Sequence, residues 1–189
     1  MRKLWRISNY CDLSGIGGEK YDARWHTAAR GKRIVYLAEH PAVALIEILV
    51  NLKGDPSTFP EKYQLMEIDV EDRVMAACQT LEDSPGPEDP ISATQGIGNA
   101  WLKSRKSALL AVPSIPSPMS TNYLLNPLHP DASGIKVVSC QWIEYDQRLF
   151  RVRKGQLQGG RAALAAVERV KPKKRSRSKT ATAKRRTKK

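Results

Sequence analysis

The chain has 189 residues, of which 32 are Lys or Arg and 19 are Asp or Glu, so its formal net charge is +13. Hydrophobic residues make up 41%, as in an ordinary globular domain, and no apolar run reaches the roughly 18 residues of a membrane span. We therefore expect a compact domain that does not enter a membrane. The three cysteines are widely spaced and odd in number, which predicts a reduced, cytoplasmic protein without a disulfide framework or a zinc site.

The positive charge is concentrated at the C-terminus. Residues 171–189 contain 11 Lys or Arg and no acid, which leaves 21 basic against 19 acidic residues in 1–170. The segment has no large apolar residue, so we predict a disordered basic tail. It is either an arm that binds nucleic acid weakly and without sequence preference, or a solvated tail that only aids solubility, and the composition favours neither.

The first half of the chain alternates between strand and helix patterns. Residues 3–8 and 34–38 have strand composition. Pro41 fits the first turn of a helix over 42–52, which is apolar on nearly every side and is therefore expected to be buried. Residues 63–70 alternate between apolar and charged side chains, which predicts a half-buried strand.

The second half is more irregular. The pattern predicts, in order, a surface loop over 82–93, a helix over 94–106, a strand over 108–112, an irregular binding loop over 113–131, a hairpin of 135–145 with 148–153, and a helix over 155–170. Because strands dominate and no parallel strand–helix–strand alternation is sustained, the fold class predicted is α+β.

Glu47 is the residue whose position is least expected. It lies inside the apolar run AVALIEILV, and only Asn51 is polar among its neighbours on the same helix face. A carboxylate there is either paired or faces a cleft, where it would stabilise a developing cation or accept a hydrogen bond from a hydroxyl. The alternative is a Glu on the one exposed edge of the helix.

Three further residues are weaker candidates. Arg24 offers a bidentate fork for phosphate or carboxylate, although a surface Arg is the default. Tyr36, in the strand before the Glu47 helix, is able to stack on a flat ring or to be a structural tyrosine. Ser114 follows a strand and is able to donate a hydrogen bond. The three histidines are far apart and show no metal-ligand spacing, so we expect no metal site.

Five segments in order resemble the RES domain, the toxin of bacterial type II toxin–antitoxin pairs. They are LWRI (4–7), ARWH (23–26), IVYLAEHPAVALIEILVNL (34–52), GNAWL (98–102) and VPSIPSPMSTNYLLNPLHPD (112–131). The sequence departs from the family pattern at Asp22, Ala23, His26 and Ser120. We expect a RES domain over 1–170 with its core motifs in 4–138, followed by the basic tail over 171–189.

The resemblance implies a fold related to the ADP-ribosyltransferases, with mixed or antiparallel sheets and flanking helices. It implies NAD⁺ as substrate without a metal, bound by Arg24, Tyr36, Glu47 and Ser114, with Glu47 and Arg24 catalytic. The reaction would be glycohydrolase or phosphorylase cleavage of the nicotinamide–ribose bond. The alternative is mono-ADP-ribosylation of a host protein such as phosphoribosyl-pyrophosphate synthetase. The implied partner is a cognate antitoxin with a DNA-binding domain.

A reading from another class is a nucleic-acid-binding module that acts through the basic tail. It predicts that deleting 171–189 abolishes the biological effect, whereas an NAD⁺-consuming enzyme would keep its activity without the tail.

Overall fold

The computed structural model describes residues 1–51, 60–81, 85–86 and 88–150. The chain divides into two compact units, Met1–Asp146 and Gln147–Lys189. The described part of the second unit is a 3₁₀ helix, η3 (Gln147–Phe150). The predicted helix over 155–170, the basic tail and parts of the predicted loop over 82–93 lie outside the described residues.

The first unit contains seven strands and five helices within the described residues. The strands are β1 (Arg2–Ile7), β2 (Val35–Ala38), β3 (Lys62–Val70), β4 (Gln79–Thr80), β5 (Leu109–Pro113), β6 (Thr121–Leu125) and β7 (Ile135–Glu144). The helices are α1 (Gly17–Lys20), α2 (Pro41–Asn51), α3 (Asp72–Ala76), α4 (Ile91–Ser104) and the 3₁₀ helix η2 (Pro130–Gly134).

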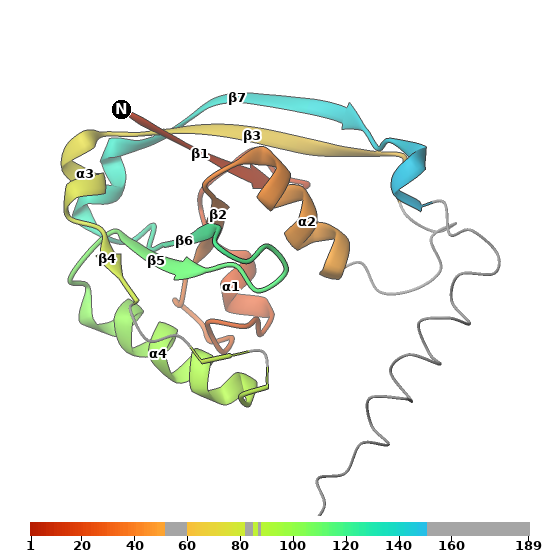
Figure 1. Ribbon diagram of the computed structural model, residues 1–189. Helices are drawn as coiled ribbons and strands as arrows, with labels where there is room; N and C mark the ends of the chain where they lie inside the picture. Colours follow the sequence, from red (N-terminus) through yellow and green to blue (C-terminus); the bar gives the residue numbers. More distant parts are fainter. Residues whose placement is uncertain (52–59, 82–84, 87, 151–189) are drawn as a thin grey trace, which may run out of the picture. The chain divides into compact units, whose positions relative to one another are not determined.

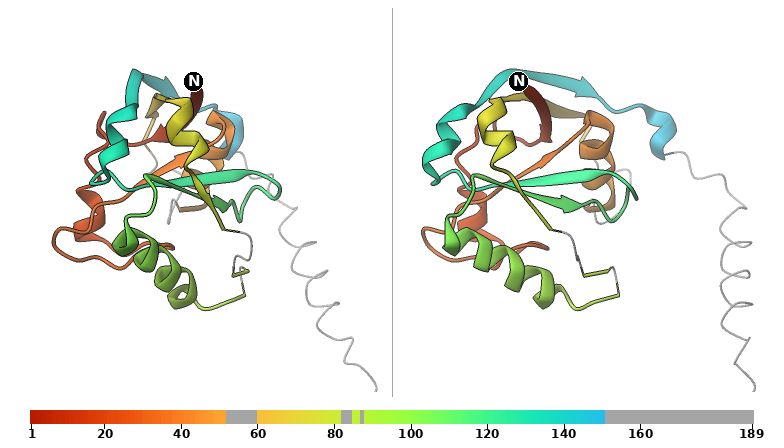
Figure 2. Two further views of the ribbon diagram at one scale, coloured as in Figure 1. Left: turned by 90° about the vertical axis from the view of Figure 1, so that its left-hand side faces the viewer. Right: turned by 60° about the vertical axis from the view of Figure 1, so that its left-hand side comes forward.

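All strands belong to one sheet in the order β4-β5-β6-β2-β1-β3-β7, antiparallel except between β4 and β5, which confirms the predicted α+β class. The joint between β1 and β2 is short, with Trp5 opposite Ala38 as the paired residues. The strands on either side of this joint form two layers, β4-β5-β6-β2 and β1-β3-β7, which are visible in Figures 1 and 2.

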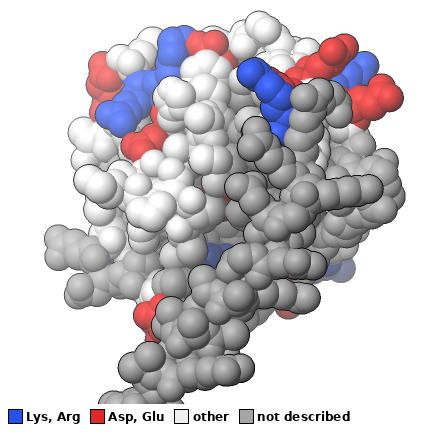
Figure 3. All heavy atoms as spheres, turned by 45° about the vertical axis from the view of Figure 1, so that its right-hand side comes forward, with Lys and Arg blue, Asp and Glu red and all other residues white. Residues whose placement is uncertain are grey.

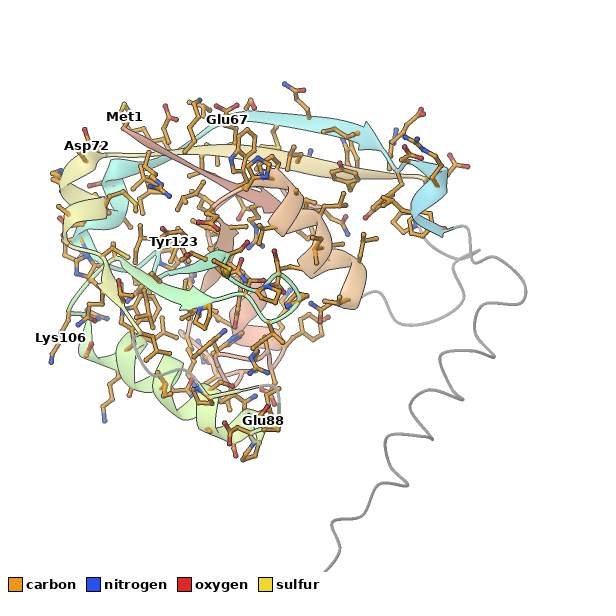
Figure 4. The ribbon with its side chains drawn as sticks, in the orientation of Figure 1. Met1, Glu67, Asp72, Glu88, Lys106 and Tyr123 are labelled. Atoms are coloured by element: carbon orange, nitrogen blue, oxygen red, sulfur yellow. A yellow bond between two sulfur atoms is a disulfide. The ribbon has the colours of Figure 1, made fainter. Side chains whose placement is uncertain are left out.

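The main core fills the space between these two layers. The alternation predicted for β3 is confirmed, because Met66, Ile68 and Val70 are fully buried and the residues between them are not. Tyr123 of β6 faces them from the other layer, where Figure 4 labels it. Successive side chains of a strand point to opposite faces of the sheet, and this alternation determines which of them enter the core.

Helix α4 covers the opposite face of the β5-β6-β2 layer. Trp101 of α4 packs with Trp25, Leu110 and Leu124 in a second core cluster. The helix predicted over 94–106 is confirmed, but it begins earlier, at Ile91 after Pro90. The cluster ties the segment around Trp25 to the sheet, which matters for the site described below.

Helix α2 is less buried than its composition predicts. It begins at Pro41, and the backbone N–H of Ala42 donates to Nδ1 of His40. Val43 and Ala44 are buried against β1 and β2, but Val50 is 58% exposed, so the expectation of burial all round is wrong. Within the described residues, no helix has the length and apolarity needed to cross a membrane.

Two further expectations are wrong. The segment 113–131 is not one irregular loop, because residues 121–125 form β6 between β5 and β2. The predicted terminal hairpin is absent from the described residues: 135–144 pairs with β3 as β7, and 148–150 belongs to η3. Residue propensities did not predict β6 within this Ser- and Pro-rich stretch, because the burial of β6 depends on strands that are distant in sequence. The short elements α3 and β4 were not predicted.

The structure joins Cys11 and Cys140 in a disulfide, with Cα atoms 6.2 Å apart, whereas Cys78 is free. The expectation that all three cysteines are reduced is therefore wrong for this pair. The 129-residue separation was misleading, because β7 pairs with β3 and β3 with β1, so Cys140 comes close to the chain that leaves β1.

Candidate active site

Glu47 lies on the face of α2 that packs on the sheet. It is four residues after Val43 and three after Ala44, the two buried residues of that face. The carboxylate is half-buried and points toward the ends of β5 and β6. The structure therefore favours the paired carboxylate over the exposed-edge alternative.

Two donors meet on one oxygen of this carboxylate. Ser114 Oγ donates to Oε1 of Glu47 at 2.7 Å, and Asn122 Nδ2 donates to the same atom at 2.6 Å. No described residue donates a hydrogen bond to Oε2. The side chain is thus fixed through one oxygen, and the other is free to accept a hydrogen bond from a ligand.

The β5–β6 hairpin brings these two donors together. In its register Val112 lies opposite Asn122, and the backbone N–H of Ser114 donates to the carbonyl of Ser120 at 2.9 Å. Asn122 is also opposite Ala38, close to the point where β2 leads into α2. Ser114 is only 5% exposed, so its hydroxyl is held in place by packing as well.

Asn122 is a site residue that sequence reasoning missed. It appeared only within the motif over 112–131, which was expected to be a loop. The available signal was a polar amide in the short run TNYLL, next to Tyr123, Leu124 and Leu125. That signal has meaning only once the run is known to be a strand whose Asn122 and Leu124 share a face.

Tyr36 is bonded to the segment that carries Arg24. Its hydroxyl accepts the backbone N–H of Trp25 at 3.3 Å and forms a 2.8 Å hydrogen bond with Nδ1 of His26. Burial raises the pKa of Tyr36 well above its ordinary value, so the phenol stays neutral. Because Tyr36 lies opposite Leu124, its Cα is diagonal to that of Asn122, about 7–8 Å away on the same face.

The Arg24 side chain contacts neither Glu47 nor Tyr36 by a hydrogen bond, and it bonds to the backbone of residues 85–86. Its Nη2 donates to the carbonyls of Gly86 at 3.1 Å and Pro85 at 3.4 Å, and its buried Nε has no hydrogen-bond partner within the described residues. The structure thus brings Glu47 together with Ser114, and Tyr36 with the Arg24 segment. Between these two groups the described residues show no direct hydrogen bond.

One face of α4 holds the segment 23–27 in place. Gly98 lets the two backbones touch, because a Cβ there would lie 1.8 Å from the carbonyl oxygen of Trp25. Neighbouring side chains on that face form hydrogen bonds: Thr94 Oγ1 to the Arg24 carbonyl, Gln95 Nε2 to the Ala23 carbonyl, and Asn99 with the Thr27 N–H and hydroxyl. The position of Arg24 is therefore set by α4.

Comparison with known proteins identifies the family. A family model for the RES domain matches residues 3–146, so this chain belongs to the RES domain family, as its five motifs predicted. The toxin Res of Pseudomonas putida (strain KT2440) is 42% identical over 147 residues, which cover 78% of this chain and 99% of that protein. The Prs ADP-ribosylating toxin of Sphingobium sp. (strain YBL2) is 35% identical over 159 residues, covering 78% and 96%.

The fold has a counterpart among solved structures. A chain in the crystal structure of the M. tuberculosis MbcT–MbcA toxin–antitoxin complex matches with a TM-score of 0.59 at 17% identity, covering 79% of this chain and 86% of that chain. At this identity the likeness establishes the fold.

The contact at Gly98 predicts an unusual cost for a small substitution. Gly98→Ala should lower the free energy of unfolding by roughly 1–3 kcal/mol and shift the amide signal of Trp25, since the new methyl group overlaps its carbonyl. Gly96→Ala is the matched control, because nothing lies within 4 Å and alanine favours a helix by roughly 0.5–1 kcal/mol. Equal effects of the two substitutions in urea unfolding would contradict the close contact.

Because His26 is buried, we predict that the folded protein loses stability at acid pH. It is 2% exposed, and desolvation followed by the charge of Lys32 lowers its pKa below the ordinary 6.5. As the pH falls through about 6.5, the unfolded chain binds a proton that the folded chain resists, so the stabilisation present above that pH is lost. Urea unfolding over about pH 5.5–7.5 should show a steeper decline in the wild type than in His26→Gln. Parallel pH profiles would refute this role.

Proposed function

We propose that this RES-domain toxin cleaves the nicotinamide–ribose bond of NAD⁺. The observation that carries the proposal is the carboxylate of Glu47, fixed through Oε1 by Ser114 and Asn122 and open at Oε2. The family and the ADP-ribosylating relative support it, because ADP-ribosylation consumes NAD⁺ at that bond.

The chemistry requires a fixed negative charge beside the ribose. When the bond breaks, nicotinamide leaves with the electron pair and positive charge spreads over the ribose C1 and ring oxygen, as in glycoside cleavage. We assign Oε2 of Glu47 to the ribose hydroxyls, where it also stabilises this cation. Because two donors already orient the carboxylate, little reorganisation is needed as the charge develops.

We assign the remaining recognition to Arg24 and Tyr36. The Tyr36 hydroxyl already bonds to Trp25 and His26, so the ring offers its face, which suits stacking on nicotinamide. Arg24 has a buried Nε without a partner in the described residues, and a guanidinium suits the diphosphate or the carboxamide oxygen. Ser114 donates to Glu47, so its proposed role is to orient that carboxylate.

Three reactions share this first step and differ in what attacks C1. Water gives ADP-ribose, inorganic phosphate gives ADP-ribose 1″-phosphate, and a protein side chain gives an ADP-ribosylated protein. Transfer to a host protein is a second candidate, because the relative from Sphingobium is a Prs ADP-ribosylating toxin. NAD⁺ labelled in the adenylate part distinguishes them: a discrete labelled protein band supports transfer, and free product alone supports hydrolysis or phosphorolysis.

Removal of the Glu47 charge should abolish most of the activity. We expect Glu47→Gln to consume NAD⁺ roughly 10²–10³-fold more slowly than the wild type, because the cation loses its preorganised counter-charge. Glu61→Gln is the control, since Glu61 is exposed and lies just before β3. Nicotinamide release by purified protein is the measurement, and Arg24→Ala is measured in parallel. Near-wild-type turnover in both Glu47→Gln and Arg24→Ala would refute the site.

The two donors to Oε1 should contribute similarly to catalysis. Ser114→Ala and Asn122→Leu should each lower kcat by roughly 10-fold with a smaller change in KM, because the carboxylate loses orientation and not its charge. Asn122→Asp should be worse than Asn122→Leu, since two carboxylates would then repel each other. Steady-state kinetics of the three variants test this, and a pure KM effect would count against an orienting role.

A protein partner is also proposed. The M. tuberculosis neighbour was solved as a toxin–antitoxin complex, which supports a cognate antitoxin for this chain, with a DNA-binding domain as an untested part of the prediction. The tail over 171–189 lies outside the described residues, so the nucleic-acid reading also stays a prediction. Growth arrest by a chain truncated after 170 would contradict the reading in which the tail carries the function.

A further inference from the structure

A second concave site lies beyond the β5–β6 hairpin, away from Glu47. A cavity of about 480 Å³ opens between the loop 29–33, the C-terminal part of α4 and the chain that follows β6. Its size is within the range of small-ligand sites. Figure 4 marks this end of α4 with Lys106, opposite the end marked by Glu88.

The cavity is lined by cations and by no acid. The five basic residues in its wall are Arg30, Lys32, Arg33, Lys103 and Arg105. Glu19, which is not part of the wall, pairs with Arg33 at 2.9 Å and also interacts electrostatically with Arg30. These five account for the basic excess of 1–170, because the other 16 basic residues there are outnumbered by 19 acidic residues.

Elsewhere on the described surface, two cations have acidic partners on both sides. Lys3 is paired with Glu67 and Asp69, and Arg73 is paired with Glu71 and Asp131. On the face shown in Figure 3, Lys and Arg are likewise interspersed with Asp and Glu. In the cavity wall, by contrast, Arg30, Lys103 and Arg105 are exposed and form no ion pair with any described residue.

We propose that this cavity binds a small phosphate-bearing ligand through Arg30, Lys103 and Arg105. Clustered guanidinium and ammonium groups recognise phosphate oxygens by charge-assisted hydrogen bonds. The cavity wall has no aromatic ring on which a base would stack, so the anionic group is what it recognises. A concave site of this volume suits a mononucleotide or a free oligophosphate better than a nucleic-acid duplex.

The site is separate from the carboxylate site. Asn122 contacts Glu47 at one end of β6, whereas Asn126, which lines the cavity, follows its other end. Four residues of extended chain place their Cα atoms about 13 Å apart. Lys32 connects the cavity wall with the segment that carries Arg24, because its Nζ donates to Thr27 and Asn99, which help to hold that segment.

Calorimetric titration of the full chain with inorganic pyrophosphate tests the proposal. We expect saturable 1:1 binding that weakens with added salt, and a loss of affinity of about tenfold or more in Arg30→Glu and in Lys103→Glu. Lys136→Glu is the charge-matched control on β7, and it should bind like the wild type. Titration with ADP then distinguishes the source of the phosphate: tighter binding than pyrophosphate indicates a nucleotide, and equal binding indicates a free anion.

Two more titrations keep the test independent of the proposed NAD⁺ site and of the tail. Arg24→Ala should retain pyrophosphate binding, and a peptide of residues 171–189 should not reproduce the saturable isotherm. The proposal is overturned if Arg24→Ala abolishes binding, if the peptide accounts for it, or if Lys136→Glu weakens it as much as Lys103→Glu does. It is also overturned if a single-stranded oligonucleotide binds and pyrophosphate does not.

Discussion

The hydrogen bonds that Ser114 and Asn122 donate to Oε1 of Glu47 join three parts of the fold at one atom. They require α2 to start directly after β2, and β6 to lie between β5 and β2 in a fixed register. A shift of one residue in that register would turn Asn122 into the core and Tyr123 out of it. The core packing that holds Tyr123 therefore also determines the orientation of the carboxylate.

The depth to which α2 is buried also matters for the Glu47 carboxylate. A helix buried on every side would place Glu47 in a medium where its charge is costly, and one exposed on that face would leave the carboxylate unoriented. α2 buries only Val43 and Ala44, and Glu47 lies on the same face at the margin of the contact. The apolar composition of the helix predicted its existence, whereas its depth depends on how β1 and β2 are placed.

How far sequence reasoning reaches differs from residue to residue. Glu47 was detectable because a charge inside an apolar helix is a local pattern, and Arg24, Tyr36 and Ser114 were supported mainly by the family resemblance. Asn122 was missed because its role depends on pairing between β5, β6 and β2, which propensity does not encode. The Cys11–Cys140 disulfide was missed for the same reason, since the β1-β3-β7 pairing places its partners. Contacts that depend on pairing between distant strands were thus the ones that local sequence patterns could not predict.

The two ends of the β5–β6 hairpin carry opposite electrostatic features, and their separation decides how they interact. Asn122 bonds to the Glu47 carboxylate and Asn126 lines the cavity, and their Cα atoms are about 13 Å apart, which exceeds the Debye length of about 8 Å at physiological ionic strength. The exposed cations therefore have little electrostatic effect on the Glu47 carboxylate. Substitutions at the two ends should affect activity independently. Any coupling would have to pass through packing, because the hydrogen bonds of Lys32 with Thr27 and Asn99 lead from the cavity wall to the segment that carries Arg24 and not to Glu47.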